Sequence, residues 1–283
     1  MKSSRSDWKS TARKFQKRLQ KKVVLEEVYN HFLEQNESTG YKFHWENGKV
    51  YIIDMAKAVH QGVVLRLIKY FMVPNGDVDD DPPIDIGLQT FHYNPYNNRI
   101  KIAADIAIQP NIVHVQHPLN PGPPPGDLEE NPHARIIVEV GSVQSTTFWN
   151  TKCETWMLQQ YVRCVFGIKL HDKRTGSNHR SMTAKLWTRQ TPAPAGSRPS
   201  TNPNLAGVSI LEWDFGTLQF NSQRPTGCTA AGIANYAVTI PVSDVFWDPP
   251  IVAGAPNVAG YVATIPAAVT ANNFVIDLYR IQQ

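Results

Sequence analysis

Two acidic residues stand in apolar, strand-like stretches of this 283-residue chain. In residues 100–108, side chains alternate, so the isoleucines face one side of a strand and Asp105 faces the other, between two alanines. Glu139 lies in residues 135–140, which are apolar on both faces, the pattern of a buried central strand. Both carboxylates are therefore candidates for chemistry in the interior of the protein.

A buried carboxylate is costly unless it is protonated, paired with a cation or bound to a metal ion. If the two strands are neighbours, Asp105 and Glu139 meet near strand ends, and their repulsion favours a cation between them. Oxygen ligands of this kind suit Mg²⁺ or Mn²⁺. The alternative is structural: Asp105 pairs with Arg99 or Lys101 at the surface, and Glu139 pairs with an arginine of the core.

A lysine follows on a predicted helix over residues 148–161. Lys152 is spaced three and four residues from Trp149 and Trp156, so all three lie on one face, which is expected to pack inward. The ammonium group either extends out to solvent or points at the carboxylates. In the second case it would stabilise the charge of a phosphate in a transition state.

The surrounding elements predict an α/β (α+β) fold, a mixed β-sheet flanked by helices. They are a helix over 7–35, a hairpin over 41–53, a helix over 56–72, two strands within 84–109, a long loop over 110–133, and strands over 135–140 and 162–170 around the helix that carries the lysine. The helix over 56–72 is expected to bury Val59, Val63, Leu67, Ile68, Phe71 and Met72.

The charge of the chain is uneven. Residues 1–22 hold nine Lys or Arg and one acid, whereas the formal net charge of the whole chain is only +4. A basic arm suits contact with nucleic-acid phosphates. The alternative is a solvated terminus that aids solubility or import.

The three cysteines show no zinc spacing, which indicates free thiols in a reducing compartment. No apolar run is long enough to cross a bilayer, and no secretory signal is recognised.

The chain resembles the Uma-two family of restriction endonucleases, within the PD-(D/E)XK nuclease superfamily. The resemblance rests on ordered motifs: Tyr41-Lys42-Phe43 and Glu46-Asn47-Gly48-Lys49-Val50, His60-Gln61, Ala104-Asp105-Ile106-Ala107-Ile108, Ile137-Val138-Glu139-Val140-Gly141-Ser142, Lys152 and Tyr161 on one helix, Phe166 to Leu170, and Ile240 to Phe246. It covers about residues 24–173 and the last of these segments. It implies a restriction-endonuclease-like core and Mg²⁺-dependent (or Mn²⁺-dependent) hydrolysis of DNA.

The resemblance also implies roles for particular residues. Asp105, Glu139 and the backbone carbonyl of Val140 would hold the metal ion, and Lys152 would be the catalytic lysine of the superfamily, placed on the helix. His60 and Gln61 would line the cleft; the alternative for His60 is a solvent-facing position at the start of its helix.

The chain departs from the family pattern at several positions. Gly141 leaves no lysine on the strand, and Ala104 and Asn150 replace a proline and an aspartate. Lys42 replaces an acid in the hairpin, and Glu46 is the candidate replacement.

Four domains or segments are expected: a basic arm over 1–23, a restriction-endonuclease-like domain over 24–190, a Pro/Ser-rich loop or linker over 191–204, and a β- and loop-rich extension over 205–283 that packs on the core. In the arm, nucleic acid is expected to contact Arg13, Lys14, Lys17 and Lys21.

Three functions compete. The first is a Mg²⁺-dependent DNA endonuclease in the cytoplasm or nucleus, without membrane contact; a homodimer would supply two active sites for a double-strand cut. The second is a nuclease-like fold that has lost its chemistry and binds nucleic acid or protein. The third is a structural or interaction protein in which the C-terminal third is the working part.

Overall fold

The computed structural model describes residues 28, 29, 31, 32, 41–46, 49–55, 58–88, 91–93, 101–115 and 132–283. The four described residues of the predicted helix over 7–35 are helical. The basic arm with Arg13, Lys14, Lys17 and Lys21 lies outside the described residues. So do residues 116–131, which make up most of the predicted long loop.

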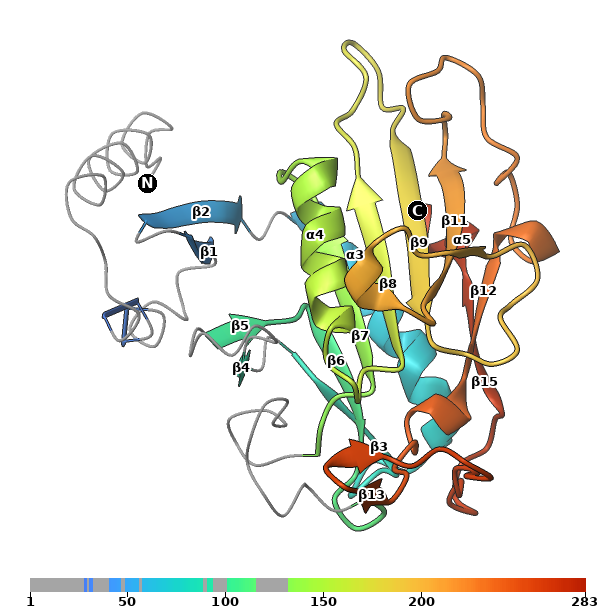
Figure 1. The fold of residues 1–283 in the computed structure, drawn as a ribbon. Coiled ribbons are helices and arrows are strands. Elements are labelled where there is room, and N and C mark those ends of the chain that lie inside the picture. Colours follow the sequence, from blue (N-terminus) through green and yellow to red (C-terminus); the bar gives the residue numbers. More distant parts are fainter. Residues whose placement is uncertain are drawn as a thin grey trace.

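A mixed β-sheet forms the centre of the fold, as the sequence predicts, and the structure gives it seven strands (Figure 1). Strands β7 and β8 pair in parallel, and every other neighbouring pair in this sheet is antiparallel. In spatial order the strands are β10 (Arg198–Pro199), β11 (Ser209–Gly216), β9 (Ser181–Thr188), β8 (Cys164–Leu170), β7 (Ile136–Gly141), β6 (Ile106–Pro110) and β3 (Ile84–Gly87).

Helix α4 (Thr146–Met157) connects the two parallel strands, because a parallel pair needs a crossover connection. The hydroxyl of Ser145 accepts a hydrogen bond from the backbone N–H of Phe148, so the helix begins at Thr146, earlier than predicted. It ends at Met157, and the prediction that Tyr161 lies on this helix is wrong. Figure 1 shows α4 on one face of the sheet and α3 (Ala58–Met72) on the other.

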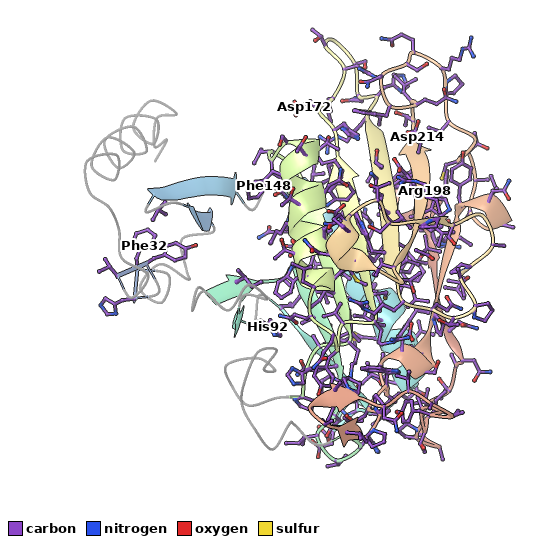
Figure 2. All side chains as sticks on the ribbon, in the orientation of Figure 1. Phe32, His92, Phe148, Asp172, Arg198 and Asp214 are labelled. Carbon is purple, nitrogen blue, oxygen red and sulfur yellow. The ribbon has the colours of Figure 1, made fainter. Side chains whose placement is uncertain are left out.

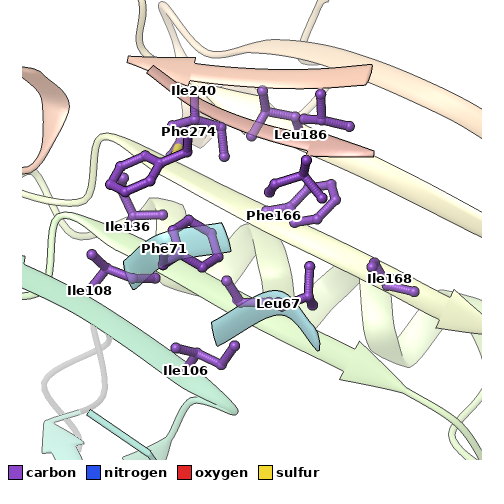
Figure 3. Packing of buried hydrophobic residues seen from close by; sticks show 14 of the residues in the cluster. Leu67, Phe71, Ile106, Ile108, Ile136, Phe166, Ile168, Leu186, Ile240 and Phe274 are labelled. Carbon is purple, nitrogen blue, oxygen red and sulfur yellow. The ribbon is translucent and has the colours of Figure 1, made fainter. Parts of the chain in front are cut away.

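The larger hydrophobic core lies between the sheet and α3. Figure 3 shows Leu67 and Phe71 of the helix against Ile106, Ile108 and Phe166 of the strands. The predicted burial of Val63, Leu67 and Phe71 is confirmed, and Ile68 is partly buried. Val59 and Met72 are 45% and 49% exposed, so their predicted burial is wrong. The face of α3 that contacts the sheet runs through His60, Val63, Leu67 and Phe71, at spacings of three and four. Val59 and Met72 lie beside this face and therefore stay partly in solvent.

The predicted single strand over residues 100–108 is two strands. Strands β5 (Lys101–Ala103) and β6 are separated at Ala104 and Asp105, and the Asp105 N–H donates to the carbonyl of Val138 on β7. Strand β5 pairs with β4 (Phe91–Tyr93), so the described residues between 84 and 109 form four short strands where two were predicted. Asp105 therefore occupies a break between strands, where its side chain is free to turn toward the neighbouring strand β7.

Residues on both sides of the Pro/Ser-rich stretch 191–204 build one sheet. The stretch contains β10, and β11 after it pairs with β9 along its whole length. The division of the chain into domains stays a prediction, but β11 belongs to the same sheet as the candidate site. The last residues form β15 (Asn273–Asp277), paired with β12 (Ala237–Pro241), and α5 (Leu278–Gln282).

The predicted hairpin over 41–53 is confirmed as β1 (Tyr41–Glu46) paired with β2 (Lys49–Met55). The three cysteines are free, as predicted, and the structure shows that all three are buried. Burial raises the pKa of the Cys228 thiol to about 11. Among the described helices, none combines the length and the apolar character needed to span a membrane.

Candidate active site

Glu139 is the centre of the candidate site. It lies on β7 and is 1% exposed, which confirms the predicted buried central strand. Its Oε1 accepts a 2.7 Å hydrogen bond from the indole Nε1 of Trp156, and its Oε2 accepts a 2.8 Å hydrogen bond from Nζ of Lys152. Both donors come from α4, so the helix that packs on this face of the sheet also fixes the carboxylate.

Lys152 points at the carboxylate instead of extending fully into solvent. Its ammonium group donates to Glu139 and also, at 3.1 Å, to the backbone carbonyl of Ala103. The side chain remains 18% exposed. The lysine thus joins β7 to the end of β5 and keeps an exposed fraction through which an anion can approach.

Asp105 is 2% exposed and lies in the break before β6. Its Oδ2 accepts a 2.7 Å hydrogen bond from the backbone N–H of Val140, and its Oδ1 lies 3.2 Å from Nε2 of His60. His60 is 3% exposed on the face of α3 that contacts the sheet, so the alternative of a solvent-facing histidine is wrong.

One network joins the two carboxylates. Asp105 binds the N–H of Val140, the residue directly after Glu139, while Lys152 binds both Glu139 and Ala103, two residues before Asp105. Strands β6 and β7 pair with Ile106 opposite Val138, which brings the predicted neighbouring strand ends together. Side chains from α3, α4 and two strand ends therefore meet at one place.

Trp156 is a site residue whose role was not predicted from the sequence. Its indole N–H, buried at 0% exposure, has a partner in the Glu139 carboxylate, and a buried indole N–H requires such a partner. The signal was present in the sequence, because Trp156 follows Lys152 by four residues and so lies beside it on the helix.

The close packing around Gly141 explains why strand β7 carries no lysine at this position. A Cβ atom at this position would lie 2.8 Å from Nε2 of Gln144 and 2.9 Å from Cδ1 of Trp149. Trp149 is buried and donates from its indole N–H to the Glu139 carbonyl at 3.3 Å, so it has little freedom to move. The close packing of α4 on β7 thus excludes a side chain here, and the cation comes from the helix.

We expect Gly141→Lys to lower the free energy of unfolding by about 2 kcal/mol, because overpacking a close-packed site typically costs about 1–3 kcal/mol. Urea unfolding of both proteins measures the difference. Gly176→Lys is the control, since a Cβ there meets no atom within 4 Å, although its positive φ of 73° adds some strain. A Gly141→Lys protein as stable as wild type would contradict this account of the packing.

The donor set fits a hard divalent cation. Mg²⁺ binds proteins through one or two carboxylates and keeps several waters, rather than requiring a complete cage of side chains. Asp105, Glu139 and the carbonyl of Val140 are oxygen donors of that type. No group of three His, Cys, Asp or Glu side chains suited to a metal ion occurs in the described part of the chain.

Other predicted residues do not join this network. The side chain of Gln61 is exposed on α3. Glu46 lies at the end of β1, but its side chain is outside the described part of the structure, as are the four basic residues of the arm.

No protein-family model matches the chain, and no curated protein matches it. One similar solved structure is a protein from Anabaena variabilis described as "a putative nuclease belonging to DUF820". The two chains are 13% identical, the match covers 60% of this chain and 87% of that chain, and the TM-score is 0.37. A similarity of this size carries no argument about function, which must come from the side chains of the site.

Proposed function

We propose that this protein is a nuclease that hydrolyses phosphodiester bonds of DNA with Mg²⁺ or Mn²⁺. The observation that supports this most is the 2.8 Å contact between Lys152 and Glu139, in a network that also holds Asp105. Two carboxylates and a lysine from separate elements are the groups that metal-assisted phosphate hydrolysis requires.

Asp105, Glu139 and the Val140 carbonyl would hold the metal ion, which when bound would polarise the scissile phosphate and lower the pKa of the attacking water. Lys152 stabilises the negative charge that develops on the phosphate oxygens. Since its ammonium group already lies against Glu139, little reorganisation is needed when the phosphate arrives.

The remaining residues position the carboxylates. The indole N–H of Trp156 holds one oxygen of Glu139, and the N–H of Val140 holds one oxygen of Asp105. Each carboxylate oxygen has more than one lone pair, so these bonds leave acceptor capacity for a cation. Nε2 of His60 lies 3.2 Å from the second oxygen of Asp105.

The proposal is tested by incubating the protein with supercoiled plasmid and single-stranded circular DNA in Mg²⁺, Mn²⁺ or EDTA. We expect nicking with either metal ion and none in EDTA. Lys152→Met should slow cleavage about 10²–10³-fold, the usual loss when one transition-state donor is removed. Lys69→Met, an exposed lysine on α3, is the matched control. Absence of cleavage with both ions, or an unchanged rate in Lys152→Met, would contradict the proposal.

A second candidate is a nuclease-like fold that binds nucleic acid without cutting it. It is favoured by the near-complete burial of Glu139 and by the donors that both of its oxygens already accept from. The same experiment separates the two functions. DNA binding that persists in EDTA, with no cleavage in Mg²⁺ or Mn²⁺, would establish binding alone.

A further inference from the structure

Two loops at one end of the sheet carry a group of basic side chains. The first, residues 171–180, joins β8 to β9, and the second, residues 217–225, follows β11. Figure 1 shows both at the top of the molecule, and Figure 2 labels Asp172 on the first loop. Asp172 is the one acidic residue in the two loops. Their basic residues, called here the basic edge, are Lys173, Arg174, Arg180 and Arg224.

The two loops are fastened to each other. The guanidinium of Arg174 donates to the carbonyl of Ser222 at 3.1 Å. The backbone of Arg180 makes two 2.9 Å hydrogen bonds with Thr217, one to its hydroxyl and one from its N–H. The rings of His171 and Phe220 stack with centroids 4.0 Å apart. The basic edge is therefore a preformed surface, which lowers the entropy cost of binding a partner.

The charges of the basic edge are not neutralised within the described part of the chain. No ion pair there involves any of its four residues, and Lys173 and Arg224 are exposed. Burial lowers the pKa of His171, on the first loop, to about 4, and repulsion from Lys169 and Arg174 acts in the same direction. A surface of this kind attracts a polyanion.

The basic edge lies beyond the carboxyl ends of the parallel strands β7 and β8. Strand β7, which carries Glu139, runs toward this end of the sheet. Glu139 on β7 is paired with Gly167 on β8, and the first loop begins four residues later, at His171. At about 3.3 Å per residue this is about 13 Å along the strand, a distance of about four nucleotide steps at about 3.4 Å each.

We propose that the basic edge binds the phosphate backbone of a nucleic-acid strand whose scissile phosphate lies at Lys152. The choice of nucleic acid as the partner rests on the proposed function. The surface itself is defined by the loops and their charges, and it makes phosphate contacts without reading base sequence. It consists of residues in 171–180 and 217–225, which are not those of the basic arm over residues 1–23.

The test measures binding in EDTA, where cleavage cannot occur. The full-length protein is titrated into fluorescein-labelled 30-base single-stranded and 30-base-pair duplex DNA at several salt concentrations. The variant is Lys173→Glu with Arg224→Glu, chosen because neither side chain bonds to the core. We expect its Kd to rise about tenfold or more near 0.1 M salt, and the slope of log K against log salt to fall by about two.

The matched control is Arg66→Glu with Lys69→Glu, which makes the same change of charge on α3, on another face of the molecule. If reversal at the basic edge destabilises the protein, as shown by its melting temperature, Lys173→Gln with Arg224→Gln replaces it. Equal loss in the two double variants, or a wild-type protein without salt-dependent affinity for either DNA, overturns the inference.

The outcome is independent of catalysis. Binding that depends on the basic edge, without cleavage in Mg²⁺ or Mn²⁺, would support this surface and contradict the nuclease proposal. Cleavage by wild type, with binding that is unchanged in the Lys173→Glu, Arg224→Glu protein, would do the reverse. Competition by polyglutamate as strong as competition by unlabelled DNA would overturn nucleic acid as the partner and favour an acidic protein.

Discussion

Glu139→Gln is expected to reduce DNA cleavage at least about 10³-fold, because it removes the charge that would hold the metal ion and position Lys152. The substitution preserves the shape of the side chain, and its amide oxygen can still accept the hydrogen bond from Trp156. Its amide nitrogen, however, cannot accept from Lys152, so the 2.8 Å contact is lost. Initial rates of plasmid nicking at saturating Mg²⁺ measure the effect.

The same variant tests metal binding without any need for activity. A ligand that binds only the folded state raises stability by about 2.7 kcal/mol when its concentration is a hundred times its Kd. Titration with Mn²⁺ should therefore raise the melting temperature of the wild-type protein, whereas Glu139→Gln should show little response. Cleavage at the wild-type rate by a folded Glu139→Gln protein would exclude this residue from the reaction.

Glu212→Gln is the matched control for this experiment. Glu212 is a half-exposed carboxylate on β11 that contacts Lys185 and Arg198, both at 3.3 Å. An exposed ion pair of this kind contributes about 0–1 kcal/mol. We expect Glu212→Gln to keep both the cleavage rate and the response to Mn²⁺. Circular dichroism of both variants confirms that each is folded before rates are compared.

The contacts of Glu139 and Lys152 were predictable because short-range periodicity determines them. A strand that is apolar on both faces buries its single carboxylate, and helical spacing places Lys152 with the tryptophans that pack inward. The contact partner of Asp105 was harder to predict from the sequence. Its contact with His60 depends on how α3 crosses the sheet, which is a tertiary feature that no local pattern contains.

The errors in the prediction have the same origin. Residues 100–108 alternate like one strand, yet they contain two, because β5 pairs with β4 whereas β6 pairs with β3 and β7. Strand β11 follows a Pro/Ser-rich stretch that resembles a linker, but it pairs with β9 across the whole strand. Sheet order is set by pairing between distant segments, so the sequence pattern alone does not reveal that this C-terminal strand completes the central sheet.

Arg135 shows how strongly the C-terminal part of the chain is bound to the core. It lies just before β7 and is 1% exposed. Its Nε donates to the Trp247 carbonyl at 2.6 Å and its Nη1 donates to the His133 carbonyl at 2.7 Å. The guanidinium lies over the ring of Tyr161, with 5.3 Å to the centroid. Burial lowers the pKa of Arg135 to about 10, and the carboxylate of Asp248, 3.5 Å away, opposes this shift.

We expect Arg135→Ala to lower the free energy of unfolding by about 3–5 kcal/mol. The substitution leaves two buried carbonyls without their donor, each costing about 1–3 kcal/mol, and also leaves a cavity beside Tyr161. Asp248 is 46% exposed, so its loss of a partner adds little. Urea unfolding followed by circular dichroism measures the change.

Two further variants separate the causes of this loss. Arg198→Ala removes an arginine that is 55% exposed and is expected to cost less than about 0.5 kcal/mol. Arg135→Met fills most of the volume without the charge, and it should cost less than Arg135→Ala, because replacing a buried charge by an apolar side chain also removes a desolvation penalty. A stability of Arg135→Ala within about 0.5 kcal/mol of wild type would contradict the role of Arg135 in holding the segment around Trp247 against the sheet.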